Sequence, residues 1–211
     1  MTTERFVSVA ETCGLIDDLG VAILRKACEQ ARAWPGIKLA VNISAVQLRN
    51  PSFTQRTLAT IADSGMDPRS IELEITETRL IDDIPGTKAI FAELRAAGIR
   101  IALDDFGTGF SSIGYLRAFE FDRIKVDRSL ISRILEDASQ QHIVQATMQL
   151  ASGLAARVTV EGIEGEEQIR LLQEIGCTEM QGYYFYKPLR AEELGLILFS
   201  YRKADEPQAA G

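Results

Sequence analysis

The chain has 211 residues, 46% of them hydrophobic and 25% charged, which is typical of a globular protein that buries one core. Its formal net charge of −7 argues against binding to a nucleic-acid polymer, because such binding depends on lysine and arginine side chains that meet phosphates. No apolar stretch approaches the roughly 20 residues of a membrane-spanning helix, and the N-terminal sequence MTTERFVSVAETCG lacks a signal-peptide pattern, so we expect a cytoplasmic protein without membrane insertion.

Helical and strand patterns alternate along the chain. Apolar spacing and short apolar runs predict helix 15–34, strand 37–44, helix 51–64, strand 71–76, helix 85–97, strand 100–106, a helix from about Ser112, strand 123–127, helix 138–155, strand 157–161, helix 165–175, strand 179–184 and helix 190–200. Residues 202–211 contain no large apolar side chain, so we expect them to form a flexible tail.

Strict alternation of strand and helix implies parallel strands with helical crossovers, as in an α/β barrel or an open doubly wound sheet. We expect a single domain over residues 1–201. A closed (β/α)8 barrel uses eight strands and about 250 residues, whereas the sequence predicts six strands. A barrel built from this chain would therefore lack strands at its front.

Each of the six predicted strands ends near a residue that can bind a metal ion or a phosphate. These residues are Asn42, Glu74, Asp104 with Asp105, Lys125 with Asp127, Glu161 and Gln181. Because parallel α/β folds bind their ligands at the carboxyl ends of the strands, the six strand ends predict one assembled site.

The segment IRIALDDFGTGFSS, residues 99–112, carries the clearest chemical signal. Asp104 and Asp105 are adjacent carboxylates at the end of an apolar strand, and burying them is costly unless cations neutralise them. A turn or a helix N-cap would explain one aspartate. The pair, with further acids on neighbouring strand ends, favours metal binding.

The segment IELEITET, residues 71–78, alternates apolar and polar residues with a period of two. In a barrel, its isoleucines and leucine would pack outward against the helices, and Glu72, Glu74 and Thr76 would face the axis. Glu74 would then lie near the rim. Glutamates on a solvent-exposed strand are the alternative.

Asn42, Lys125 and Asp127 each allow two interpretations. Asn42 supplies a neutral oxygen at a strand end, as a metal ligand or as an Asx-turn residue. Lys125 and Asp127 share one strand face, where they could form an ion pair or orient a water molecule.

The residues at the last two strand ends also allow two interpretations each. Glu161 and Glu164 could bind metal, but acids near the start of a helix are also favoured by the helix dipole. Gln181 precedes Gly182, which would let the backbone approach a ligand closely. A buried amide that satisfies loop backbone is the alternative for Gln181.

Any metal must be held by oxygen. The three cysteines are widely spaced and His142 is the only histidine, which argues against a disulfide framework, a cysteine or histidine zinc site and Ser-His-Asp catalysis. Hard oxygen donors suit Mg²⁺ or Mn²⁺ and are compatible with Ca²⁺. So many acids favour two ions, and paired ions about 4 Å apart are typical of in-line displacement at phosphorus. Phosphodiester hydrolysis is therefore the predicted reaction class.

Seven segments together carry a family resemblance: FVSVAETCGLI, VNISAVQL, LEITET, LDDFGTGFSS, IKVDRS, VEGIE and QGYYFYKPL. In this order they resemble the EAL domain family of cyclic di-GMP phosphodiesterases over nearly the whole chain. The resemblance implies a modified (β/α)8 barrel that hydrolyses cyclic di-GMP to linear pGpG with Mg²⁺ or Mn²⁺, and Ca²⁺ would inhibit it.

The resemblance also implies a role for each site residue. Asn42, Glu74 and Asp104 would bind one metal ion, and Asp104, Asp105 and Glu161 the second, so that Asp104 bridges the two ions. Lys125 and Asp127 would hold the catalytic water, Glu164 and Gln181 would support metals and substrate, and Pro188 would contact the substrate with Gln181. Glu77 would brace the DDFGTGFSS loop, through which the family also forms homodimers.

The chain lacks the Glu-Ala-Leu signature of the family, whose glutamate is the first metal ligand and whose following arginine helps to seat the substrate. That signature normally precedes the FVSVAE segment, where the front strands are missing. We therefore expect weakened binding of the first ion, unpaired sheet edges at 37–44 and 179–184, and little turnover if the chain is complete. A catalytically inactive binding or interaction module is the main alternative, and an enolase-like barrel fits the motifs poorly.

Overall fold

The computed structural model describes residues 3–76, 83–109 and 113–205. Six parallel strands form one sheet in chain order: β1 (Leu39–Ile43), β2 (Ile71–Thr76), β3 (Arg100–Phe106), β4 (Arg123–Val126), β5 (Arg157–Val160) and β6 (Glu179–Met180). The helices are α1 (Thr3–Thr12), α2 (Ile16–Ala31), α3 (Phe53–Ser64), α4 (Ile84–Ala96), α5 (Ile113–Phe119), α6 (Ala138–Gly153), α7 (Glu166–Ile175) and α8 (Ala191–Asp205). The predicted six parallel strands with helical crossovers are confirmed.

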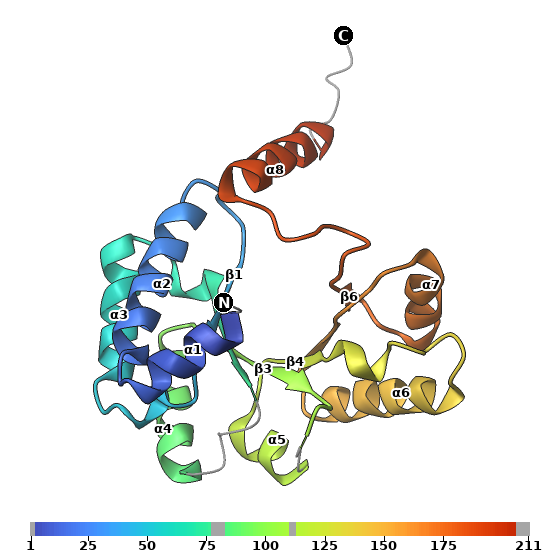
Figure 1. Ribbon diagram of the computed structural model, residues 1–211, viewed down its shortest axis with the longest axis horizontal. Coiled ribbons are helices and arrows are strands. Elements are labelled where there is room, and N and C mark those ends of the chain that lie inside the picture. The colour runs from blue at the N-terminus through green and yellow to red at the C-terminus, as the bar shows by residue number, and fades with distance from the viewer. Residues whose placement is uncertain (1–2, 77–82, 110–112, 206–211) are drawn as a thin grey trace.

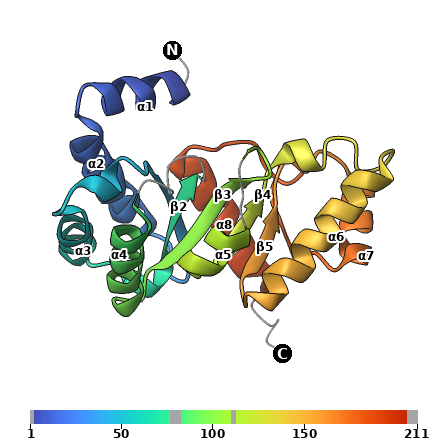
Figure 2. The ribbon, with the colours of Figure 1, turned by 90° about the horizontal axis from the view of Figure 1, so that it is seen from below.

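The sheet curves, and the crossover helices cover its outer face (Figures 1 and 2). Ile71, Leu73 and Ile75 of β2 are fully buried in the core between sheet and helices, as the period-two pattern predicts. Glu72 and Glu74, which alternate with them, line a cavity on the inner face. The polar lining of this inner face is what positions the site.

The sheet does not close among the described residues. β1 and β6 stand at its two ends, and each pairs with a single neighbouring strand, β2 and β5 respectively. The predicted open edges are therefore confirmed. Ala40 and Asn42 of β1 are exposed, whereas their register partners Glu72 and Glu74 on β2 are buried.

Three elements differ from the sequence prediction. The helix α1 was not predicted, because its β-branched residues Val7 and Val9 weaken the helical signal. Strand β6 ends at Met180 instead of residue 184, since the Gly182 carbonyl accepts hydrogen bonds from the N–H groups of Phe185 and Tyr186 and turns the chain. Helix α8 continues to Asp205, four residues into the segment expected to be a tail.

Candidate active site

A bulge in β3 brings the two adjacent aspartates to one place. In a regular strand, neighbouring side chains point to opposite faces, so Asp104 and Asp105 could not share a site. The pairing of β3 with β4 shifts register between Leu103 and Phe106, and Asp105 has a left-handed backbone with φ of 57°. As a result, carboxylate oxygens of Asp104, Asp105 and Glu161 lie within 4.8 Å of one another.

The Lys125 ammonium group links carboxylates from three other parts of the sheet. Its Nζ lies 2.9 Å from Glu74 on β2, 3.0 Å from Asp104 on β3 and 2.8 Å from Glu161 after β5. The Lys125 side chain is 7% exposed, so these contacts are shielded from water. The predicted strand-end convergence therefore holds for these four residues.

Asp127 does not form the ion pair with Lys125 that its place on the same strand face allows. Its Oδ1 instead accepts a hydrogen bond of 2.9 Å from the N–H of Ser129 and caps the short 3-10 helix that follows. Asp127 is half-buried.

Burial and charge act against each other in this site. Burial raises the pKa of the Glu74 and Glu161 carboxyl groups, and the nearby Lys125 ammonium opposes that rise. Burial alone would lower the pKa of Lys125, but its hydrogen bonds and charge interactions with the carboxylates outweigh burial and raise it. The ammonium group of Lys125 contacts three carboxylates, and Asp105 adds a fourth to the site, so the excess negative charge favours divalent cations.

The donor set fits a hard divalent cation. Oxygen ligands of one Mg²⁺ held at about 2.1 Å lie about 3.0 to 4.2 Å apart. The oxygens of Asp104, Asp105 and Glu161, within 4.8 Å of one another, need only small side-chain rotations to reach this spacing. Such a cation would provide Lewis-acid activation of a phosphodiester.

Asn42 reaches the same end of the sheet. Asn42 lies within β1, so the alternative of an Asx-turn residue is wrong. It pairs in register with Glu74 on β2. Residues paired in register on parallel strands point to the same face, so Asn42 lies beside Glu74 on the inner face. Its side chain is exposed because β1 is an edge strand.

A second cavity, of about 330 Å³, adjoins Glu161. It is lined by Glu164, Gln181 and Pro188, which the sequence assigns to substrate and metal support, and Gln181 is exposed, so the buried-amide interpretation is wrong. Sequence reasoning missed four more lining residues: Arg128, Tyr183, Tyr186 and Lys187. The aromatic run after Gly182 was the signal that could have indicated them. Glu77 lies outside the described residues.

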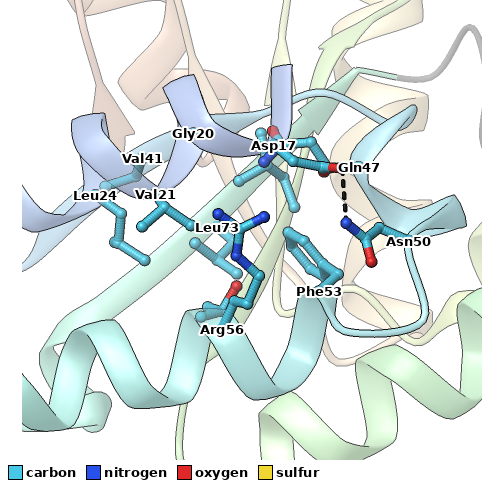
Figure 3. A pocket seen from close by; sticks show the side chains of 12 residues that line it. Asp17, Gly20, Val21, Leu24, Val41, Gln47, Asn50, Phe53, Arg56 and Leu73 are labelled. Carbon is cyan, nitrogen blue, oxygen red and sulfur yellow. Dashed lines mark hydrogen bonds between the residues drawn. The ribbon is translucent and has the colours of Figure 1, made fainter. Parts of the chain in front are cut away.

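A smaller cavity on the helix side contains none of the predicted site residues. It lies between α2, α3 and β1 (Figure 3), and the Asn50 amide donates a 2.7 Å hydrogen bond to Asp17 at its edge. Its volume of about 20 Å³ is enough for about one water molecule. This cavity is therefore part of the core packing.

Known relatives match along most of the chain. An uncharacterized signaling protein of Caulobacter vibrioides is 42% identical over 190 residues, which are 90% of this chain and 24% of that protein. The cyclic di-GMP phosphodiesterase NbdA of Pseudomonas aeruginosa is 36% identical over 204 residues, 94% of this chain and 26% of that protein. The chain thus spans about a quarter of the length of these relatives.

Solved structures share the fold. A c-di-GMP complex of the PaMucR phosphodiesterase is 33% identical with a TM-score of 0.85, covering 92% of this chain and 81% of that one. A manganese and cy-diGMP complex of Klebsiella pneumoniae BlrP1 is 28% identical with a TM-score of 0.74, covering 80% of this chain and 44% of that one. The expected TIM-like barrel of EAL type is confirmed by these neighbours.

No helix within the described part of the chain has the length and hydrophobicity that crossing a bilayer requires. The EAL domain family matches residues 1–188, which include every strand and the whole acidic cluster. The chain belongs to the EAL domain family.

Proposed function

We propose that this chain is a metal-dependent phosphodiesterase domain that hydrolyses cyclic di-GMP to linear pGpG. The observation that carries the proposal is a cluster of carboxylates at the carboxyl end of the sheet: Glu74, Asp104 and Glu161 contact Lys125, and Asp105 lies beside Asp104 and Glu161. Family membership supports the proposed substrate and metal, as do the c-di-GMP in the PaMucR complex and the manganese and cy-diGMP in the BlrP1 complex.

The chain's own residues would divide the work. Asp104, Asp105 and Glu161 would hold one Mg²⁺ or Mn²⁺, and Glu74 and Asn42 would contribute with Asp104 to a second. Water would add across one phosphodiester bond of the ring, so that one phosphate stays on a 5′ oxygen and the 3′ oxygen leaves as a hydroxyl.

Lys125 and Asp127 would position that water. The Lys125 ammonium group lies within 3.0 Å of three carboxylates. Once those carboxylates bind cations, the ammonium group would have hydrogen-bond donors available to hold a water molecule beside the cluster. Glu164, Gln181 and Pro188 line the adjoining cavity and would contact the substrate there, and Glu77 would brace the 104–112 loop.

A binding module without turnover is the second candidate. The 211 residues contain no Glu-Ala-Leu signature, and Asn42 is exposed on an open sheet edge, so the first ion would have fewer and less enclosed ligands. Such a domain would bind cyclic di-GMP, or a protein partner, and report its level without cleaving it.

One experiment separates the two candidates. The protein is incubated with cyclic di-GMP and Mn²⁺, the products are resolved by chromatography, and nucleotide binding is measured in parallel with Ca²⁺, which we expect to prevent hydrolysis. Formation of pGpG supports the enzyme, and binding without product supports the module.

Two variants test the metal assignment. We expect Glu74→Gln and Asp104→Asn to lower the hydrolysis rate by at least a hundredfold, because each removes a charged ligand from the cluster. Lys88→Ala, an exposed change on α4, is the matched control and should keep the parent rate. An unchanged rate in either cluster variant would refute the assignment.

We further propose a homodimer formed through the 104–112 loop region, and a cytoplasmic location. The dimer is supported by Ile113, which follows this loop at the start of α5 and is 64% exposed. A homodimer through this loop region would bury the Ile113 side chain.

A further inference from the structure

A short turn at the end of β4 lies between the two loops that carry the candidate metal ligands. We call it the β4 turn, and it comprises Asp127 and the 3-10 helix Arg128–Leu130. The strand order places β4 between β3, which ends with Asp104 and Asp105, and β5, which is followed by Glu161. Within this turn, the proposed hydrolysis assigns a role to Asp127 alone.

The candidate ligands come from strands that are not neighbours in the sheet. Adjacent strands lie about 4.8 Å apart, so the backbones of β3 and β5 are separated by roughly twice that distance, with β4 between them. Carboxylate oxygens of Asp104, Asp105 and Glu161 nevertheless lie within 4.8 Å of one another. Metal–ligand distances in proteins vary by only about 0.2 Å. The separation of the two loops therefore decides how well these three carboxylates bind one ion.

On one side, the β4 turn packs against the loop that follows Asp105. Gly107 in this loop has a left-handed backbone with φ of 101°, and a Cβ there would overlap Cδ1 of Leu130. The Asp127 N–H donates a 3.1 Å hydrogen bond to the carbonyl of Phe106. Leu130 is half-buried and packs on the hydrophobic core, so the Gly107 backbone rests against a side chain that is held in place.

On the other side, the β4 turn packs against the loop that follows β5. Gly162, the residue after Glu161, has φ of 78°, and a Cβ there would overlap Cβ of Arg128. The Glu161 N–H donates a 3.0 Å hydrogen bond to the carbonyl of Val126 at the end of β4. A glycine thus lets each loop approach the turn closely, within two residues of a candidate ligand.

Hydrogen bonds fix the shape of the β4 turn itself. Asp127 Oδ1 accepts a 2.9 Å bond from the Ser129 N–H, and the Asp127 carbonyl accepts a 3.1 Å bond from the Leu130 N–H. From α6, Nε2 of Gln140 donates a 3.1 Å bond to the carbonyl of Ser129. The turn is therefore a firm spacer between the two loops.

We propose that Leu130 is a positioning residue that sets the distance between Asp105 and Glu161. Its side chain keeps the backbone of Gly107 away from the β4 turn, and the opposite side of the same turn meets the loop after β5. Loss of side-chain volume at Leu130 lets the loop after β3 move toward β4 and changes the spacing of the carboxylates. The inference rests on the proposed metal site and adds to it a residue that supplies no ligand atom.

Mn²⁺ is the probe for the test. The full chain is freed of metal with EDTA and dialysed, Mn²⁺ is titrated, and free Mn²⁺ is measured by electron paramagnetic resonance. We expect Leu130→Ala to raise the Kd for Mn²⁺ about tenfold or more, because groups that orient metal ligands contribute about 10- to 100-fold to affinity. Leu130→Met keeps the side-chain volume and should stay within about threefold of the parent.

Leu58→Ala is the matched control, since Leu58 is also half-buried against the core but lies on α3, which carries none of the candidate ligands. Urea unfolding of each variant separates a loss of stability from a loss of positioning. An unchanged Kd in Leu130→Ala, an equal rise in Leu58→Ala, or no rescue by Leu130→Met would overturn the inference while metal binding by the parent stands. A parent that binds no Mn²⁺ would overturn the proposed metal site, and this inference with it.

Discussion

At the scale of single residues, Lys125 is the side chain on which the candidate active site depends most. Its ammonium group contacts Glu74, Asp104 and Glu161, and the side chain is almost fully buried. In a buried ion cluster, removal of one partner leaves the others with uncompensated charge. Lys125 therefore contributes to stability as well as to the proposed chemistry.

We expect Lys125→Met to lower the free energy of unfolding by about 3 kcal/mol in EDTA, because the carboxylates lose their counter-charge. The loss should be smaller in Mn²⁺, since a divalent cation can replace the ammonium charge. Urea unfolding under both conditions measures the two effects, with Lys88→Met as the control. Equal stability of parent and variant in EDTA would show that the ion cluster does not stabilise the fold.

The buried thiol of Cys28 gives a prediction for pH. Burial raises its pKa above the ordinary value of 9.0, against a smaller opposing effect of Ser64. Well below pH 9 the Cys28 thiol is protonated in both the folded and the unfolded protein. As the pH rises past 9, the unfolded chain releases this proton more readily than the folded one. The free energy of unfolding therefore falls as the pH rises. We expect Cys28→Ala to show a shallower fall between pH 8 and 10 than the parent or exposed Cys13→Ala, measured by urea unfolding. Parallel curves for all three would contradict it.

At the scale of elements, the loop after β5 and the turn after β6 depend on close backbone contact. A Cβ at Gly182 would overlap the backbone N and O of Ile163, whose N–H donates to Gln181 and whose carbonyl accepts from Tyr184. This contact fixes Gln181 beside the cavity that Glu161 and Glu164 line. Backbone geometry here sets the shape of the candidate substrate site.

We expect Gly182→Ala to lower the free energy of unfolding by about 1–3 kcal/mol, because the backbone of Ile163 cannot move away cheaply. Gly153→Ala is the matched control, since nothing lies within 4 Å of its Cβ position at the end of α6. Thermal unfolding of both variants checks the prediction. It fails if Gly182→Ala is as stable as the control.

Sequence periodicity predicts which face of a strand or helix a residue occupies. It does not predict how far along the sheet the residue lies relative to neighbouring strands, or which side chains it contacts. Alternation in IELEITET correctly separated the buried Ile71 and Leu73 from the inward Glu74. It could not predict that Lys125 on β4 contacts Glu74 on β2 across the intervening strand β3, because that contact depends on how the strands are staggered. The pairing of Arg100 and Arg123 with Glu72 escaped prediction for the same reason. Nor could periodicity predict that Asp127 caps the turn that follows.

At the scale of the whole molecule, the six strands of the described residues form a curved barrel wall with β1 and β6 at its two ends. A strand at the end of a sheet presents unpaired backbone N–H and C=O groups, which can pair with another polypeptide. The proposed homodimer uses another part of the surface, around the 104–112 loop. The two modes of association are therefore separable by mutation.

We expect Ile113→Asp to shift a dimer to monomer, because it places a charge in the proposed interface. Light scattering after size-exclusion chromatography measures the mass of the 23.3 kDa chain over a range of concentrations. Leu196→Asp is the control, since Leu196 is 74% exposed on α8, away from the loop in sequence. A dimer that persists in Ile113→Asp and dissociates in Leu196→Asp would place the interface on α8 instead.

The irregular step between Leu103 and Phe106 makes the length of this segment as important as its composition. Asp104 and Asp105 are the two residues of this step, so deleting either of them would restore an even ladder with β4 and leave one carboxylate at the end of the strand. A homologue with a regular strand at this point would therefore present one candidate ligand where this chain presents two.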